Sequence, residues 1–390
     1  MAPKLEFGNQ PKVSTVKKST GFRKSINRMT TKKTLSTKKQ PLPPKDEDFG
    51  SDQIGLFRDL LCNTDEERDS LSNVFDLWDG IPRYSISRQQ QDKWRKAGAF
   101  PQLHNILFHY RGRELKATIQ PAWIEDKDGS ITGYYPSANE ELIEDVLRKI
   151  AASQNNGYFD AKESRSGVVF TLYMVRKELE NRGHSRTYKE INLSLEIMAR
   201  SVIITGTADG KEGGFTSNSL YLNNLYRVSK SKLAEDPDAK WFVDFHPFAS
   251  RAMDELTYRQ FNYARLMSHK SQLARWLDKV LSLKYLNAGV LHPFEMRLST
   301  IIRDSKLLDG YGRFTNAVAA VDSAFEELQT CQPPLLLKKP QKNVIIGERG
   351  KILDMVYTLH PSREFVAEVK AASKRHALAA DKSKPVDNSG

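Results

Sequence analysis

The stretch Gly167–Arg200, GVVFTLYMVRKELENRGHSRTYKEINLSLEIMAR, decides the fold of this chain. Gly167–Phe170 predicts a short strand, and Thr171 is placed to cap a helix that ends before the turn Arg182–His184. A second helix begins after Ser185 and runs to the end of the stretch. Two short amphipathic helices joined by a tight turn that contains glycine predict a helix-turn-helix.

The apolar residues of both helices recur at helical spacing, so each helix has one face to bury. These residues are Leu172, Val175 and Leu179 in the first helix and Tyr188, Ile191, Leu195 and Met198 in the second. Two strands are expected next, over Val202–Thr205 and Ser219–Leu222, around the polar, glycine-rich segment Ala208–Gly214. A helix-turn-helix followed by a β-hairpin predicts a winged helix.

The same order of elements recurs further along the chain. We expect helices over residues 257–267, 271–286 and 294–308, a turn at Gly310–Gly312, and a helix over residues 313–329 with the apolar face Phe314, Val318, Val321, Phe325 and Leu328. A hairpin follows, with strands Val344–Ile346 and Leu353–Tyr357 around Gly347–Gly350, and a last helix opens at Pro361 and runs to about His376. The sequence therefore predicts a second winged helix.

Upstream of these units, residues 71–115 mix aromatic and basic side chains and are expected to be rich in strands. A strand pattern continues over residues 115–124, and Asp128-Gly129 indicates a turn. The first clear helix starts near Ser137, where Glu140 completes a capping box.

The predicted fold class is α+β, with two tandem winged-helix domains behind a disordered basic N-terminal tail. The expected boundaries are residues 1–50 for the tail, 51–95 for a linker, 96–240 and 241–376 for the two winged-helix domains, and 377–390 for a disordered C-terminus.

Positive charge is concentrated in the tail. The formal net charge is +12, and residues 1–45 hold twelve Lys and Arg against the single acid Glu6, so the rest of the chain is nearly neutral. A lysine-rich segment with few aromatic residues stays disordered when free and binds polyanions such as nucleic acid. No stretch resembles a signal-peptide core or a membrane span, so we expect a cytoplasmic protein.

In a helix-turn-helix the N-terminal end of the second helix faces base edges in the major groove. The residues expected to contact DNA there are Arg182, His184, Ser185, Arg186 and Lys189 in the first unit, and Arg303, Lys306, Arg313, Thr315 and Asn316 in the second. Lys211 and Lys351 in the two hairpins are the expected wing contacts. Each residue taken singly also fits a solvated charge at a helix start, and the repetition of the arrangement favours DNA.

The peptide Gln53-Ile54-Gly55-Leu56-Phe57 places two large apolar side chains at the end of the polar lead-in. Its spacing, Gln-x-x-Leu-Phe, looks like the short peptide by which bacterial proteins bind the replicative sliding clamp. The alternative is an amphipathic first helix that buries Leu56 and Phe57 on the body of the protein.

We find no set of residues suited to catalysis. Cys62 and Cys331 are far apart and are expected to be reduced, structural thiols without zinc. The segment Gly206–Glu212 has the wrong glycine spacing for a phosphate-binding loop, and its last residue is not the Ser or Thr that holds magnesium. His246 and His292 each lack the paired histidine that a metal-dependent nicking enzyme requires. We therefore expect a protein that is not an enzyme and uses no cofactor or metal.

The order of elements, with the Gln-x-x-Leu-Phe peptide upstream, resembles that of the TrfA-like, iteron-binding replication initiators of broad-host-range bacterial plasmids. The resemblance covers about residues 50–335. It is most specific at Gln53–Phe57, at Arg186-x-Tyr188 with Leu195 and Met198, and in the helix from Arg313 to the segment Ala324–Leu328.

This resemblance implies a monomer that binds direct repeats (iterons) in a plasmid origin, opens the adjacent AT-rich duplex and recruits the host initiator, the replicative helicase and the sliding clamp. It also implies homodimers that are inactive or repress their own gene, which is a form of plasmid copy control. Gln53, Leu56 and Phe57 would hold the clamp, and Arg186 and Arg313 would read or grip DNA. Two features depart from the family: Ile54-Gly55 replaces the commoner Leu followed by Ser or Asp, and the basic tail has no fixed counterpart.

Three other functions stay open at this point. The first is a sequence-specific transcriptional repressor or copy-number regulator. The second is a duplicated winged helix that serves as a protein-docking scaffold. The third, a relaxase or rolling-circle nicking enzyme, is disfavoured by the missing histidine pair.

Overall fold

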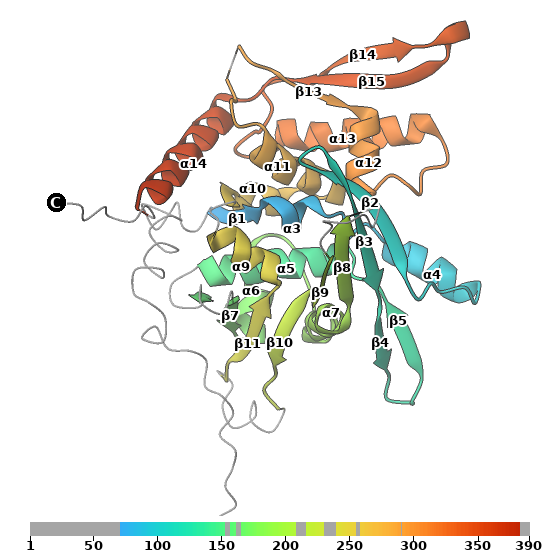
Figure 1. Ribbon diagram of the computed structural model, residues 1–390, viewed down its shortest axis with the longest axis vertical. Coiled ribbons are helices and arrows are strands. Elements are labelled where there is room, and N and C mark those ends of the chain that lie inside the picture. The colour runs from blue at the N-terminus through green and yellow to red at the C-terminus, as the bar shows by residue number, and fades with distance from the viewer. Residues whose placement is uncertain are drawn as a thin grey trace, which may run out of the picture. The chain divides into compact units, whose positions relative to one another are not determined.

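The computed structural model describes residues 71–152, 157–160, 165–207, 216–229, 239–254, 258–289 and 291–382, which all belong to one compact unit. The expected tail (residues 1–50), the peptide Gln53–Phe57, Cys62 and Lys211 lie outside the described residues. The described part is a mixed α and β fold (Figure 1).

The two helices predicted on either side of the turn Arg182–His184 are present as α6 (Leu172–Asn181) and α7 (Tyr188–Arg200), and the helix expected near Ser137 precedes them as α5 (Ala138–Ala152). The side chain of Thr171 caps α6, and Gly183 in the turn adopts a left-handed φ of 82°, which glycine allows without strain. α7 begins later than predicted because Thr187 caps it, in a capping box with Glu190. Tyr188 is thus in the first turn and is 42% exposed, so its predicted burial is wrong.

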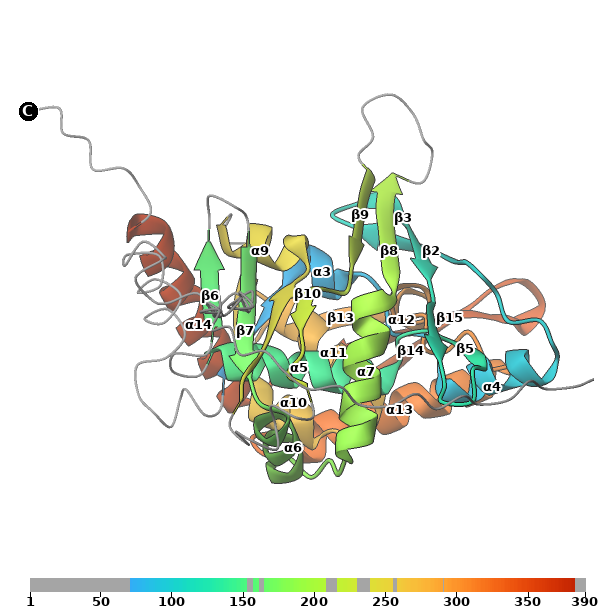
Figure 2. The ribbon, with the colours of Figure 1, turned by 90° about the horizontal axis from the view of Figure 1, so that it is seen from below.

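Two four-stranded antiparallel sheets flank these helices (Figure 2). One has the order β2-β3-β8-β9, from β2 (His104–Tyr110), β3 (Arg113–Gln120), β8 (Val202–Thr207) and β9 (Thr216–Leu220). The other has the order β10-β11-β7-β6, from β10 (Leu222–Tyr226), β11 (Trp241–Phe245), β7 (Arg165–Phe170) and β6 (Gly157–Asp160). The hairpin predicted after the helix-turn-helix is present as β8–β9, but β9 ends at Leu220 and not at Leu222. The hairpin is not separate, because β8 also pairs with β3 and the two strands belong to the sheet that contains β2 and β3. A short hairpin, β4 (Ala122–Glu125) and β5 (Ile131–Tyr134), precedes α5.

The expected boundary between residues 240 and 241 is wrong. β11 lies between β10 and β7, and its residues Trp241, Val243 and Phe245 belong to the core that also contains α6 and α7. α9 (Pro247–Asp254), β12 (Tyr258–Asn262) and α10 (Tyr263–Ser268) follow in the same half of the molecule. The helix predicted over residues 257–267 therefore starts as a strand, because β12 pairs with a strand far upstream.

That upstream strand is β1 (Leu71–Phe75), which pairs antiparallel with β12 in register from Leu71↔Asn262 to Phe75↔Tyr258. α3 (Asp76–Gly80) and α4 (Arg88–Lys96) follow. The sequence predicts a linker over residues 51–95 and many strands over residues 71–115. Residues 71–95 instead form β1, α3 and α4, so they are not a linker. Trp78 is only 1% exposed and stacks on His246, with ring centroids 4.0 Å apart. This segment is held by burial of large aromatic side chains, which contribute much of the energy of a core.

The C-terminal half of the described chain (Gln272–Lys382) contains the second helix-turn-helix. Its elements are α11 (Gln272–Lys284), β13 (Phe294–Arg297), α12 (Leu298–Ser305), α13 (Phe314–Thr330), β14 (Gln341–Ile346), the single turn η2 (Glu348–Gly350), β15 (Ile352–Leu359) and α14 (Arg363–Lys382). The helix predicted over residues 294–308 opens as β13, which pairs with β15 in a sheet of order β13-β15-β14. α14 continues to Lys382, so the predicted disordered C-terminus does not begin at residue 377.

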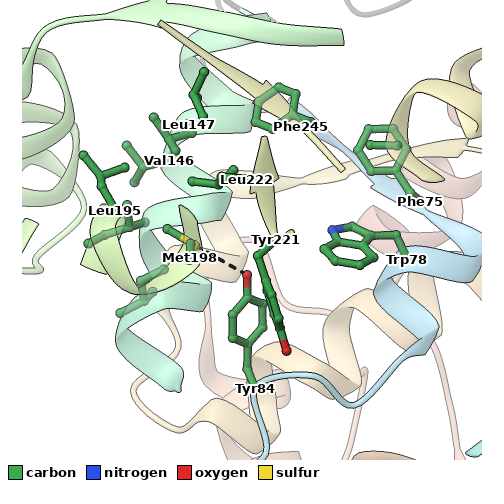
Figure 3. Packing of buried hydrophobic residues seen from close by; sticks show 14 of the residues in the cluster. Phe75, Trp78, Tyr84, Val146, Leu147, Leu195, Met198, Tyr221, Leu222 and Phe245 are labelled. Atoms are coloured by element: carbon green, nitrogen blue, oxygen red, sulfur yellow. Dashed lines mark hydrogen bonds between the residues drawn. The ribbon is translucent and has the colours of Figure 1, made fainter. Parts of the chain in front are cut away.

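Each half has its own apolar core. In the N-terminal half (Leu71–Ser268), Tyr84, Trp78 and Tyr221 pack together beside Leu195 and Met198 of α7 (Figure 3). The Tyr84 hydroxyl lies 3.7 Å from the sulfur of Met198. The second core contains Val321, Phe325 and Leu328 of α13 as predicted, together with Tyr357 of β15.

Buried charges connect the halves. Lys279 on α11 places Nζ 2.7 and 2.8 Å from the carboxylate oxygens of Asp145 on α5, and 3.4 Å from a carboxylate oxygen of Glu141. On α10, Arg265 donates two hydrogen bonds, of 2.9 and 2.8 Å, to Asp278 on α11. Burial by itself would raise the pKa of Asp278, but the guanidinium of Arg265 lowers it to about 2. The two halves are therefore joined by paired charges that are almost entirely buried.

Candidate nucleic-acid interface

The turn before α13 and the first turn of this helix are exposed at every residue from Asp309 to Asn316. Arg313 is the N-cap of α13, and Arg313, Thr315 and Asn316 are all exposed. Ala317 and Val321 are buried in the second core, which fixes the helix so that its first turn projects outward. The structure thus brings together three of the residues that the sequence predicted to contact DNA.

Two aromatic side chains accompany this turn, and sequence reasoning missed both. Tyr311, between two glycines in the turn before α13, is 47% exposed, and Phe314, predicted to lie on the buried face, is 41% exposed. Phe314 is the first residue of α13, one turn before the apolar stripe meets the core. An exposed aromatic ring beside an arginine suits contact with sugars and bases better than it suits bulk water.

Farther along α13 the exposed surface changes character. Ala319 and Ser323 are exposed and short, whereas Glu326 is an exposed acid. Asp322 is partly exposed and pairs with Lys342 of β14. Negative charge at the C-terminal end would repel a phosphate backbone, so only the N-terminal part of α13 is suited to approach DNA.

The β14–β15 hairpin carries cations and apolar side chains at its tip. Lys351, the predicted wing contact, is exposed, and so is Arg349, which the prediction omitted. Arg349 adopts a left-handed φ of 59° within η2. Ile346 and Leu353 beside them are 63% and 60% exposed. The tip therefore offers charge for phosphates and an apolar surface on the same short hairpin.

Arg303 and Lys306 differ from the exposed turn. Arg303 donates hydrogen bonds of 2.6 and 3.1 Å to the neighbouring carboxylate of Asp304, which raises the pKa of Arg303 and neutralises part of its field. Lys306 has a left-handed φ of 55° at the end of α12. α12, which Lys306 follows, contacts β2 of the N-terminal half. Arg303 is thus exposed but paired, and Lys306 is partly buried.

In the first helix-turn-helix, three predicted contacts are engaged within the protein. The side chain of Arg182 donates a 2.9 Å hydrogen bond to Glu178. The His184 ring nitrogen Nε2 lies 2.8 Å from the carbonyl oxygen of Met267, and burial lowers the pKa of this histidine. Arg186 donates to the side chain of Asn139 and, over 2.7 Å, to the carbonyl of Ser185. These contacts fix the turn against α5 and α10.

The exposed residues of this unit form a second basic and aromatic surface. Ser185 and Lys189 are exposed as predicted. Next to them, the guanidinium of Arg176 donates a 2.7 Å hydrogen bond to Glu180 and lies 5.0 Å from the ring centroid of Tyr188. Lys177 lies 5.6 Å from the ring centroid of Tyr173. Sequence reasoning missed these two pairs; the Tyr173–Lys177 pair was visible as an i, i+4 spacing on one helix. We call Tyr173, Arg176, Lys177 and Tyr188 the α6–α7 face.

The C-terminal part of α7 is covered. The β4–β5 hairpin packs on it through Ile124, which contacts the small cluster that contains Ile197. Arg200 reaches the carbonyl oxygen of Trp123 over 3.4 Å and pairs with Glu196 on its own helix. Only the first turns of α7 are therefore accessible to a ligand as large as duplex DNA.

No helix among the described residues has the length and apolar composition needed to cross a bilayer. In the same part of the chain, no three His, Cys, Asp or Glu side chains gather as a metal-binding group would.

Comparison with known proteins gives a distant structural likeness. No family model and no curated protein matches the sequence. A crystal structure of domains 2 and 3 of RctB, as selenomethionine derivatives, aligns with a TM-score of 0.46 and 9% identity over 73% of this chain and 97% of that one. A second structure of RctB domains 2–3 aligns with a TM-score of 0.40 and 12% identity, over 69% and 95% of the two chains. A likeness at this level concerns the broad arrangement of elements and assigns no function.

Proposed function

We propose that this protein is a sequence-specific DNA-binding initiator of plasmid replication that performs no catalytic step. The observation that supports it best is the joint exposure of Arg313, Thr315 and Asn316 at the start of a helix that follows a helix-turn-helix turn. Arginine and asparagine are the side chains that bind guanine and adenine bidentately in the major groove.

We further propose that the C-terminal half is a winged helix. Its elements run α11, β13, α12, α13, β14, β15, and the strand before the helix-turn-helix pairs with the second strand of the hairpin. The tip of that hairpin, with Arg349 and Lys351, would then contact the backbone beside the groove occupied by α13. In this proposal α13 provides the main contacts to base edges.

The N-terminal half is proposed to be a second, modified winged helix, whose hairpin β8–β9 has joined the sheet of β2 and β3. Because Arg182, His184 and Arg186 are engaged by the protein, we assign its DNA contacts to Ser185, Lys189 and the α6–α7 face. These residues suit phosphate and sugar contacts, so this half would grip the backbone while α13 reads sequence. The tail would add affinity that falls with salt.

The partners belong to the same proposal: double-stranded origin DNA, the bacterial sliding clamp, the host initiator and the replicative helicase, with a homodimer as an alternative state. The clamp contact is assigned to Gln53, Leu56 and Phe57. A variant with all three changed to alanine should lose retention on immobilised clamp and keep duplex binding. Equal retention of the variant and the wild type would remove the clamp from the proposal.

The experiment that tests the function has two stages. First, a duplex is selected from a random pool by the purified protein; recovery of no common sequence would contradict sequence-specific binding. Second, a circular DNA that carries the selected repeats and this gene is introduced into a bacterial host. Autonomous replication supports an initiator, whereas repression of an adjacent promoter without replication would identify a transcriptional repressor or copy-number regulator.

A further inference from the structure

A large cavity lies at one end of the sheet β2-β3-β8-β9, away from both helix-turn-helix turns. Its volume is about 750 Å³. The residues that matter for its chemistry are Tyr110, Arg111, Arg113, Thr216, Phe248 and Arg251. Figure 2 shows the end of the sheet where β2 turns into β3 and β9 begins, with α3 and α9 alongside. The volume lies in the range of about 300–1,000 Å³ typical of small-molecule sites.

The turn between β2 and β3 directs two arginines to this cavity. Arg111 and Gly112 have φ values of 48° and 77°, so the chain reverses within two residues, and Tyr110 pairs with Arg113 across the turn. Tight turns with two left-handed residues match the twist of the strands and hold a defined geometry. Arg111 thus lies within a two-residue turn and Arg113 directly follows it, so neither is on a long loop.

Three arginines line the cavity. Arg111 is held by Asp76, with hydrogen bonds of 3.1 and 2.7 Å, and the Tyr110 hydroxyl donates to the same carboxylate over 3.0 Å. Arg113 has no ion pair among the described residues and is exposed. Arg251 on α9 adds a third guanidinium to the lining. The described residues that line the cavity thus include three arginines and no acidic residue, and guanidinium forks bind phosphate oxygens bidentately.

The remaining walls are suited to a flat ring and to a sugar. Phe248 lines the cavity and is fixed from behind by His246, whose ring centroid lies 4.7 Å away. Leu77 of α3 adds a second apolar surface. Thr216 and Ser217, at the start of β9, supply hydroxyl groups that can exchange hydrogen bonds with a polar ligand. Apolar side chains and cations that line one cavity are the combination that a nucleotide requires.

We propose that this cavity is a nucleotide-binding site, in which Arg113 and Arg251 hold the phosphate and Phe248 and Leu77 contact the base. Two ligands present the same phosphate, sugar and base to such a site: a free mononucleotide and the end of a single DNA strand. The inference rests on the cavity itself and does not require that α13 reads DNA.

The test measures binding by the full-length protein, without divalent metal, of three ligands: ATP, sodium pyrophosphate and an oligodeoxythymidylate of ten nucleotides. We expect ATP to bind, pyrophosphate to compete with it more weakly because it lacks the ring, and Arg113→Gln to weaken ATP binding at least tenfold. Arg251→Gln should act in the same direction. The control Lys370→Gln removes one exposed cation from α14 and should change binding less than twofold.

The outcomes separate the two sources and the two proposals. Binding of ATP that Arg113→Gln weakens assigns a free nucleotide, and binding of the oligonucleotide alone, weakened by the same change, assigns the end of a strand. Failure of the wild type to bind either ligand, or equal binding by Arg113→Gln and wild type, overturns the inference. Arg313→Ala should bind ATP as the wild type does, because Arg313 does not line the cavity. ATP binding can therefore be observed even if the protein proves not to bind duplex DNA in a sequence-specific manner.

Discussion

Replacing Lys279 by alanine should destabilise the protein strongly, because the lysine joins the two halves from a buried position. Its side chain is 7% exposed, and those of Asp145 and Glu141 are 3% and 9% exposed. Removing the ammonium leaves two buried carboxylates without the cation that lies nearest to both. Breaking a buried pair in this way costs about 3–5 kcal/mol.

The loss should depend on pH with a definite sign. Burial already raises the pKa of Asp145, and Lys279 is the main group that opposes this. Without Lys279 the folded-state pKa of Asp145 rises further above its unfolded value. The folded variant then binds a proton that the unfolded chain does not, so the variant gains stability as the pH falls. The destabilisation should therefore be smaller at pH 5 than at pH 8.

Urea denaturation of the wild type, Lys279→Ala and the double variant Lys279→Met/Asp145→Leu measures these effects. The double variant removes both charges and should recover part of the loss. Lys342→Ala is the matched control, because Lys342 pairs with Asp322 at the surface, where the side chains are 30% and 28% exposed. Exposed pairs contribute about 0–1 kcal/mol. If Lys279→Ala costs no more than Lys342→Ala, the ion pair does not hold the halves together and the reasoning is refuted.

Three further predictions concern stability and binding. Burial, with a smaller effect from Arg83, lowers the pKa of His246 in the folded protein from 6.5 to about 3. As the pH falls below about 6.5, His246 is protonated in the unfolded chain but not in the folded protein, so the free energy of unfolding decreases. His246→Phe should remove this effect, and urea titrations at pH 7 and pH 5 should show the wild type losing about 2 kcal/mol more than the variant; equal losses would contradict the assignment. Removing residues 1–45 should weaken binding to selected and random duplexes alike and flatten its salt dependence, and an unchanged slope would show that the tail does not contact phosphates. Lys189→Ala should lower affinity for both duplexes equally and reduce the salt slope by about one unit, whereas a loss confined to the selected duplex would make Lys189 a base contact.

Local patterns in the sequence predict much of the fold. α6 has the bounds that its apolar spacing and Thr171 indicate, and the β14–β15 hairpin falls where the glycines around residue 347 place it. Both depend on contacts between residues close in sequence. Val175 and Leu179 of α6, and Val321, Phe325 and Leu328 of α13, are buried as their periodicity predicts.

The errors occur where distant residues decide the structure. Tyr258–Asn262 is a strand only because Leu71–Phe75 pairs with it, and no local pattern contains that information. The same pairing turns residues 71–95 from an expected linker into part of the first core. β11 belongs to the N-terminal half because its neighbours in the sheet are β10 and β7. These two strands lie on opposite sides of the first helix-turn-helix in the sequence, so no local pattern reveals the pairing.

The candidate DNA contacts follow the same division. The exposure of Arg313, Thr315 and Asn316 was predictable, because a helix that starts after a glycine-rich turn projects its first residues. The engagement of His184 and Arg186 was not, since their partners Met267 and Asn139 are distant in sequence. The i, i+4 partner of Arg182, Glu178, was visible in the sequence and was overlooked.

The most direct test of the account compares Arg313→Ala with the wild type on a selected duplex and on a random duplex at one fixed salt concentration. If Arg313 binds a guanine bidentately, the variant loses about 1–3 kcal/mol on the selected duplex and nothing on the random one. Arg363→Ala, which removes an exposed arginine from the start of α14, should leave both affinities unchanged. An equal loss of affinity for both duplexes in Arg313→Ala would make Arg313 a phosphate contact and contradict the claim that α13 reads the DNA sequence.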